Sequence, residues 1–206
     1  MCGIFGYIGD REALPYLVEG LKKLEYRGYD SAGVATINKG KISIVKCVGK
    51  IGNVEKALSK NPIKGNTGLG HTRWATHGRP SFENSHPHTD CKGKLALIHN
   101  GIIENYAELK RSLEEEGHVF KSTTDTEVLA HLIEKNLDHD LEAAVRAALA
   151  QVIGSYAIAV LSADDPDLIV AAKSGSPLII GIGENESFIA SDIPALIKYT
   201  GRIIIL

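Results

Sequence analysis

The sequence contains little sulfur and no long apolar run. Among its 206 residues are three cysteines, one methionine and one tryptophan. So few cysteines, odd in number, argue against a disulfide framework and favour a reduced, cytoplasmic chain. No apolar segment reaches the roughly 18–20 residues of a membrane helix. The first residues also lack the basic and apolar regions of a secretion signal. These absences predict a soluble cytoplasmic protein.

The sequence also has no large excess of positive or negative charge. The formal net charge is −2, and no basic run stands out, so neither nucleic acid nor an anionic membrane is an expected partner. The chain has no Walker-type loop, and Gly181-Ile182-Gly183 lacks the remaining glycines of a dinucleotide fingerprint. We therefore expect no nucleotide cofactor.

Metal-ligand spacings are absent too. The chain contains no Cys-x-x-Cys or His-Glu-x-x-His pattern, the usual signs of a zinc site. His86, His88, Asp90 and Cys91 are close in sequence, but Pro87 between the two histidines suits a rigid loop with solvated or hydrogen-bonded imidazoles. The expectation is therefore no metal and no cofactor of any kind.

What is present is enough apolar residue for a core, 44% of the chain. Apolar periodicity predicts a helix ending near Leu24, helices in the middle of the chain, and strands at both ends. No Pro/Ser-rich linker divides the sequence, so we predict one α+β domain, residues 1–206, with two sheets carrying helices on their outer faces. Further expectations are a 34–37/41–48 hairpin, a strand at 95–99 ended by a turn at Asn100-Gly101, a capping box at Thr124–Glu127, and five short strands after Gly154.

Cys2 is a candidate nucleophile. If Met1 is removed, Cys2 carries both a thiol and a free α-amine, whose ordinary pKa values are about 8.5 and 7.7–8.0. One residue would then supply nucleophile and base, as an N-terminal Thr does in other enzymes. The apolar, glycine-containing stretch that follows predicts a strand that holds this terminus inside the fold. Taken alone, however, Cys2 is simply the residue that follows an initiator Met, and only the rest of the chain makes it a nucleophile.

Three further positions have the chemistry that attack on an amide needs. Arg73 offers a planar guanidinium fork to a carboxylate, or a surface salt bridge. Asp125, at a predicted helix start, can hold an ammonium group, cap its helix, or do both. Asn100-Gly101 supplies a side-chain amide and a backbone N–H to a developing oxyanion, or forms an ordinary turn.

Taken together, these segments resemble the class II glutamine amidotransferase family, and the resemblance covers essentially the whole chain. One stretch, Tyr26 to Gly33, is most similar to the glutamine–fructose-6-phosphate aminotransferase (glucosamine-6-phosphate synthase) branch. The segments that carry the resemblance are Cys2-Gly3-Ile4-Phe5-Gly6, Leu24 to Gly33, Thr72-Arg73-Trp74-Ala75-Thr76-His77-Gly78, His99-Asn100-Gly101, Thr124-Asp125-Thr126-Glu127, Ser174 to Leu178 and Ala190-Ser191-Asp192.

The resemblance implies an N-terminal nucleophile hydrolase fold, an αββα sandwich of two mainly antiparallel sheets flanked by helices. It implies that Cys2 attacks the side-chain amide of L-glutamine, giving a γ-glutamyl thioester and ammonia. Asn100 and Gly101 would stabilise the tetrahedral oxyanion.

The resemblance also implies how glutamine is bound. Arg73 would hold the substrate α-carboxylate and Asp125 the α-ammonium. Further residues expected at the pocket are Thr76, His77, Arg27 and Trp74.

In that branch of the family, sugar-isomerase domains follow in the same polypeptide, bind fructose 6-phosphate, use the ammonia to make glucosamine 6-phosphate and form a homodimer. Those domains are missing from this sequence, so we expect an isolated glutaminase domain. Three alternatives stay open. The chain is the glutaminase domain of an amidophosphoribosyltransferase or asparagine synthetase type of enzyme; it is a glutamine-binding module with Met1 retained; or it is an N-terminal-nucleophile protease or acylase.

Overall fold

The computed structural model describes residues 2–206. Met1, and with it the expectation that Met1 is removed, lies outside the described residues. The elements are β1 Gly3–Gly9, α1 Ala13–Leu24, η1 Glu25–Arg27, β2 Ser31–Asn38, β3 Lys41–Val48, α2 Ile51–Lys60, β4 Thr67–Arg73, β5 His88–Thr89, β6 Leu95–Ile103, α3 Tyr106–Glu115, α4 Glu127–Asn136, α5 Leu141–Leu149, β7 Gly154–Ser162, β8 Asp165–Ser174, β9 Ile179–Ile182, β10 Glu186–Ala190, η2 Ile193–Ala195 and β11 Ile203–Ile205.

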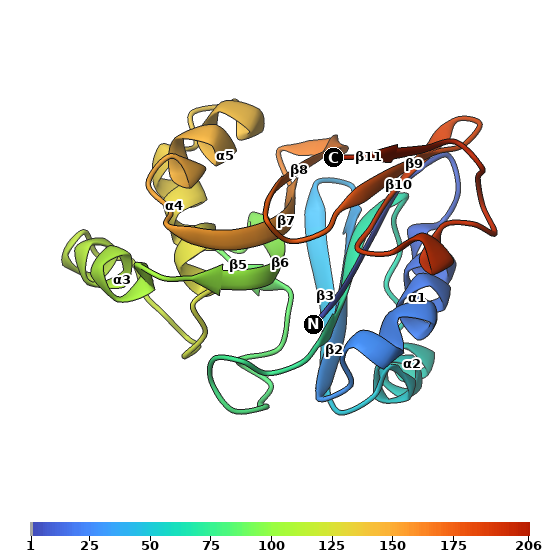
Figure 1. Ribbon diagram of the computed structural model, residues 1–206, viewed down its shortest axis with the longest axis horizontal. Coiled ribbons are helices and arrows are strands. Elements are labelled where there is room, and N and C mark those ends of the chain that lie inside the picture. The colour runs from blue at the N-terminus through green and yellow to red at the C-terminus, as the bar shows by residue number, and fades with distance from the viewer. Residues whose placement is uncertain (1) are drawn as a thin grey trace.

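The strands form two antiparallel sheets packed face to face. One has seven strands in the order β11-β9-β10-β1-β4-β2-β3, and the other has four in the order β5-β6-β7-β8. Helices α1 and α2 cover the outer face of the larger sheet, and α3, α4 and α5 lie beside the smaller one (Figure 1). The predicted α+β class and αββα layering are confirmed. None of the described helices combines the length and apolarity that crossing a bilayer requires.

The alternation of side chains along each strand explains this layering. Successive side chains of a strand point to opposite faces of its sheet. In β1, Ile4 therefore packs between the two sheets, whereas Phe5 and Tyr7 pack against α1 and α2. In β6, Ile98 faces the other sheet and Leu97 faces the helices. The chain thus has three apolar layers, one between the sheets and one under each set of helices.

The first strand lies in the interior of the larger sheet. It pairs with β4 on one side and with β10 on the other, so the residue that precedes it is anchored from both directions. Ser191, just after β10, adds to this anchoring: its Oγ accepts from the Ile4 N–H at 3.0 Å, and its N–H donates to the Ile4 carbonyl at 3.0 Å. Cys2, which precedes β1, is therefore held in place at the end of an interior strand of the larger sheet, as the sequence predicts.

Two local expectations are wrong. The predicted turn at Asn100-Gly101 is not a turn, because β6 continues through both residues, paired with β7. Gly101 has φ +134°, and a Cβ there would lie 1.9 Å from the Ser155 carbonyl oxygen; the glycine serves close strand packing. The capping box is also absent: the Glu127 carboxylate accepts from the backbone N–H groups of Lys121 and Ser122 at 2.9 and 2.6 Å.

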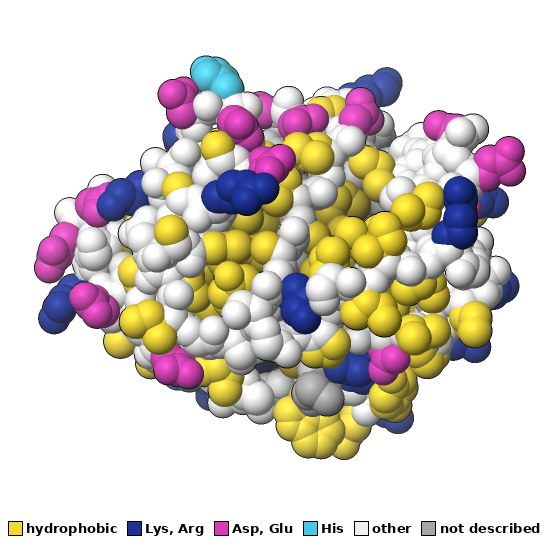
Figure 2. Space-filling model, turned by 45° about the horizontal axis from the view of Figure 1, so that its top comes forward, with side chains coloured by type: hydrophobic (Ala, Val, Ile, Leu, Met, Phe, Trp, Pro, Cys, Tyr) yellow, Lys and Arg dark blue, Asp and Glu magenta, His cyan; other side chains and the backbone are white. Residues whose placement is uncertain are grey.

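One face of the molecule exposes many hydrophobic side chains. Figure 2 brings the top of Figure 1, where the C-terminal strands lie, toward the viewer. Hydrophobic side chains are gathered on this side of the molecule. Among the exposed apolar residues of the C-terminal segment are Ile197, Ile204 and Ile205, the last of them 76% exposed.

Candidate active site

A small pocket forms where four distant parts of the chain meet. Its walls come from the residue before β1, the end of β4 with the loop that follows, the middle of β6, and the segment before α4. Seven of the nine predicted site residues line it: Cys2, Arg73, Trp74, Thr76, His77, Gly101 and Asp125.

The Cys2 thiol is held against the loop after β4. The Trp74 N–H donates to Cys2 Sγ at 3.1 Å, and the thiol lies 3.4 Å from the Trp74 carbonyl oxygen. Burial raises the pKa of the Cys2 thiol, although the Trp74 N–H and the nearby Arg73 guanidinium oppose that rise. The resting group is thus a thiol, and a nucleophilic attack requires a base to take its proton.

Arg73 ends β4 and is 4% exposed. Its Nη2 donates to the carbonyl oxygens of His77 and Gly78, the latter at 3.0 Å. Its Nη1 is buried and finds no hydrogen-bond partner within residues 2–206. An unpaired buried guanidinium donor is costly, so this position suits a hydrogen-bond acceptor from a ligand.

Asp125 faces the same pocket from the segment before α4, with 5% of its surface exposed. One carboxylate oxygen, Oδ2, accepts from the Ile103 N–H at 2.8 Å, which fixes the side chain on β6. The carboxylate borders the pocket. Arg73 and Asp125 therefore present opposite charges in one small pocket, which suits a zwitterionic amino acid.

Asn100 lies beside Cys2 but is oriented by a residue that the sequence analysis missed. Its Nδ2 donates to the Cys2 carbonyl at 3.0 Å. Its Oδ1 lies 3.0 Å from His71 Nε2, which is also 3.1 Å from the His99 carbonyl oxygen. Because that carbonyl only accepts, His71 Nε2 carries the proton, and Asn100 must then turn its oxygen to His71 and its NH₂ to Cys2.

The imidazole side chains around Asn100 and Cys2 are uncharged. Burial lowers the pKa of His71 to about 3 and also lowers the pKa values of His86 and His99. His71 stacks on His86 with ring centroids 4.0 Å apart. Nothing in the sequence pointed to His71, apart from its place in the polar stretch before Arg73, because its partner is distant in the chain.

The remaining predicted residues take different places. Arg27 does not line the pocket; its Nε donates to the Cys2 carbonyl at 3.1 Å, and its Nη1 pairs with Asp192 at 2.8 Å. Trp74 and Thr76 are exposed on the loop after β4, and the Trp74 ring meets Tyr29 edge-on at 5.5 Å. The fourth, His77, packs edge-on against Tyr106 with ring centroids 4.5 Å apart.

Comparison with known sequences agrees with this geometry. The model of the glutamine amidotransferase domain family matches residues 71–198, more than half of the chain. The glutamine–fructose-6-phosphate aminotransferases (isomerizing) of Pyrococcus horikoshii and Aquifex aeolicus are 59% and 55% identical to it, each over 100% of this chain.

Solved structures give the same result for the fold. A glutamine phosphoribosylpyrophosphate amidotransferase from B. subtilis superposes with a TM-score of 0.83 at 32% identity, covering 99% of this chain and 47% of that one. An allosteric regulatory enzyme of purine biosynthesis superposes with a TM-score of 0.84 at 30% identity, covering 99% and 46%. This chain spans about a third of its curated relatives, 35% of the length of the two named above.

Proposed function

The chain belongs to the family of glutamine amidotransferase domains, and on that premise we propose that it hydrolyses the side-chain amide of glutamine to glutamate and ammonia, with Cys2 as the nucleophile. One observation carries the proposal: a half-buried thiol, a guanidinium donor with no partner among residues 2–206 and a carboxylate meet in one pocket. A metal-free acyl transfer through sulfur needs these parts and no cofactor.

The proposed reaction begins with Cys2 Sγ attacking the side-chain carbonyl carbon of glutamine. The thiol proton passes to the α-amine that Cys2 has once Met1 is removed, and from there to the departing nitrogen. The C–N bond breaks, ammonia leaves, and a γ-glutamyl thioester forms. Water then adds to the thioester carbonyl, the C–S bond breaks, and glutamate and the Cys2 thiol are released. Because burial raises the pKa of the thiol, the amine is an essential base.

Asn100 and Gly101 are the proposed oxyanion donors. The Asn100 NH₂ is already turned toward Cys2, and one of its two N–H groups remains for a negative charge that develops next to Sγ. Gly101 lines the same pocket, at a position of the β6–β7 pairing that only glycine fits, and its backbone N–H would be the second donor. Fixed donors of this kind stabilise the tetrahedral intermediate without reorganisation.

Arg73 and Asp125 are the proposed clamp for the amino-acid end of the substrate. The free Nη1 of Arg73 would donate to the α-carboxylate, and Asp125 would accept from the α-ammonium. We assign Thr76, His77 and Trp74 to the loop that closes the pocket around glutamine. Arg27 would act from outside the pocket, by holding the Cys2 backbone in place through the Cys2 carbonyl.

The test is ammonia release by the purified chain after its intact mass has been measured. The form that lacks one Met residue is expected to release ammonia from glutamine, and Cys2→Ala is expected to release none while it still binds glutamate. Cys47→Ala is the matched control, since Cys47 is a half-buried thiol of β3 that is not among the residues lining the pocket. Full turnover by Cys2→Ala, or by the form that retains Met1, would refute the proposal.

In a full-length protein we propose that the ammonia converts fructose 6-phosphate to glucosamine 6-phosphate in the cytoplasm. Residues 1–206 would be the glutaminase domain, and the sugar-isomerase domains, which also form the homodimer, would lie in the other two thirds of the relatives' length. The chain is 59% identical to a glutamine–fructose-6-phosphate aminotransferase and 32% identical to a phosphoribosylpyrophosphate amidotransferase. The higher identity favours the aminotransferase branch of the family. The exposed apolar face of Figure 2 is the surface that those domains would cover. This chain alone should form no glucosamine 6-phosphate when both substrates are supplied.

A further inference from the structure

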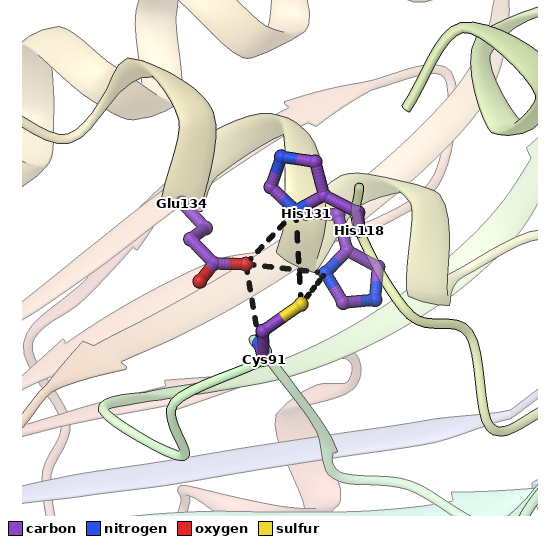
Figure 3. Close-up of side chains that lie close together, drawn as sticks. All are labelled: Cys91, His118, His131 and Glu134. Carbon is purple, nitrogen blue, oxygen red and sulfur yellow. Dashed lines mark hydrogen bonds and ion pairs between the residues drawn. The ribbon is translucent and has the colours of Figure 1, made fainter. Parts of the chain in front are cut away.

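Four metal-ligating side chains converge outside the glutamine pocket. Cys91 lies in the turn between β5 and β6, His118 lies in the loop after α3, and His131 and Glu134 stand one turn apart on α4. Figure 3 shows the sulfur, one nitrogen of each imidazole and one carboxylate oxygen directed at a common point. All four ligand atoms lie within 4.8 Å of one another.

Four of the six separations between ligand atoms are close to the edges of a zinc tetrahedron. With Zn–S near 2.3 Å and Zn–N and Zn–O near 2.0–2.2 Å, tetrahedral angles place sulfur about 3.5–3.6 Å from nitrogen, and nitrogen about 3.3–3.4 Å from oxygen. Here Cys91 Sγ is 3.6 Å from His131 Nδ1 and 3.8 Å from His118 Nδ1. Glu134 Oε2 is 3.3 Å from His131 Nδ1 and 3.1 Å from His118 Nδ1. The other two separations are at most 4.8 Å, against about 3.3–3.6 Å in a zinc tetrahedron, so the side chains would have to close in by up to about 1 Å to seat the ion.

The surroundings of His131 are those of a metal ligand. Its side chain is 1% exposed, and while Nδ1 faces the cluster, the buried Nε2 has no hydrogen-bond partner in the part of the chain described. The Glu127 carboxylate lies 3.7 Å from that Nε2. A carboxylate that accepts from the second nitrogen of a ligating histidine fixes its tautomer and raises its basicity, and Glu127 would take that role if His131 moved a few tenths of an ångström closer on binding the ion.

The other ligands are also supported from behind. The Val119 N–H points at Cys91 Sγ at 3.5 Å, a contact that favours a thiolate. The Cys91 N–H donates to Glu134 Oε2 at 3.1 Å. His118 and Glu134 are 14% and 11% exposed, while Cys91 is exposed at the surface. The site is thus mostly shielded, with one open side by which an ion can enter.

We propose that Cys91, His118, His131 and Glu134 form a structural site for one Zn²⁺ ion. One thiolate, two imidazoles and a carboxylate are ligands that zinc favours, and four protein ligands leave no open position for substrate. In the sequence, the histidines nearest to Cys91 that could bind a metal with it are His86 and His88, and their spacing leads to the expectation of no metal. Those two histidines instead face the buried cluster near the glutamine pocket, where His88 bonds Thr124 at 3.1 Å.

Such an ion would join three segments that are far apart in the chain. It would fasten the end of α3 and the turn before β6 to α4, and so restrain residues 118–125, which lead to Asp125. The metal is therefore expected to stabilise the wall of the pocket without taking part in the reaction. Without an ion, Glu134 Oε2 would accept hydrogen bonds from the Cys91 N–H and from both imidazoles, and that metal-free network is the competing explanation.

The test is titration of the untagged, chelator-treated chain with Co²⁺ and with Zn²⁺. We expect one Co²⁺ per chain, a thiolate-to-cobalt charge-transfer band, and the visible bands of tetrahedral cobalt. A hundredfold excess of Zn²⁺ over its Kd should raise Tm by about 5–10 °C. Cys91→Ser should lose the charge-transfer band and at least tenfold in affinity, and His131→Ala should lose the Zn²⁺-dependent rise in Tm.

Matched controls replace a thiol and an imidazole elsewhere. Cys47→Ser and His139→Ala, the latter at a fully exposed side chain, should bind cobalt as the unaltered chain does. Equal cobalt spectra from the unaltered chain and Cys91→Ser, or no stoichiometric Zn²⁺ binding by the unaltered chain, would overturn the proposal and leave the hydrogen-bonded network. Cys91→Ser should keep the ammonia-release rate per folded molecule, which separates this site from the proposed reaction.

Discussion

Replacement of His71 tests whether the orientation of Asn100 matters for catalysis. His71 is fully buried and touches no substrate atom in the proposed reaction. Its Nε2–H is the group that holds Asn100 Oδ1, and so decides which end of that amide faces Cys2. His71→Leu removes the donor, while His71→Gln keeps an N–H near the position of Nε2. The two variants therefore separate a positioning role from simple packing.

The expected size follows from one hydrogen bond. A bond of this kind contributes about 1–1.5 kcal/mol, so losing the preference it gives should lower kcat about five- to tenfold. Asn100→Ala removes the donor itself and should lower kcat by roughly 10²–10³. His71→Leu should also destabilise the fold by about 1–3 kcal/mol, because Asn100 Oδ1 is left buried without a partner.

The assay is steady-state ammonia release well below the Tm of each variant. His71→Leu should lower kcat and leave KM for glutamine nearly unchanged, since Arg73 and Asp125 still hold the amino-acid end. His71→Gln should recover most of kcat. In the double variant with Asn100→Ala, the His71 substitution should cost nothing further, because its effect acts through Asn100. Additive losses, or a normal kcat in His71→Leu, would refute this reasoning.

Three other substitutions should change KM, Tm or the pH dependence of stability in a stated direction. Arg73→Lys should raise KM for glutamine with a smaller effect on kcat, because one ammonium cannot hold the loop carbonyls as Nη2 does and also reach the α-carboxylate as Nη1 would; an unchanged KM would assign Arg73 to structure alone. Gly101→Ala should prevent folding or lower Tm sharply, since its Cβ would overlap the Ser155 carbonyl, and a normal melting curve would contradict the strand geometry. Burial lowers the pKa of Lys46 to about 8, below its unfolded value near 10.4, so the unfolded chain binds more protons between these pH values. Urea unfolding should therefore show the unaltered chain gaining about 1–2 kcal/mol relative to Lys46→Met between pH 7.5 and 9.5, and a constant difference would exclude the shifted pKa.

The sequence by itself determined the layers and the chemistry of the pocket. Alternation and helical spacing depend only on near neighbours, so β1, α1 and the five C-terminal strands could be predicted from the chain. The residue types of Cys2, Arg73 and Asp125, together with the family resemblance, were enough to predict a glutamine site before any contact was known.

Only the tertiary structure decided how these groups are held. Asn100-Gly101 has the composition of a turn, yet pairing with β7 keeps both residues in a strand. Asn100 meets Cys2 across 98 positions of sequence, and Cys91 meets His131 across 40. Such contacts leave no periodic signal, because strand order and helix packing, rather than local spacing, bring the atoms together. For the same reason spacing along the chain groups Cys91 with His86 and His88, whereas the fold places it with His118, His131 and Glu134.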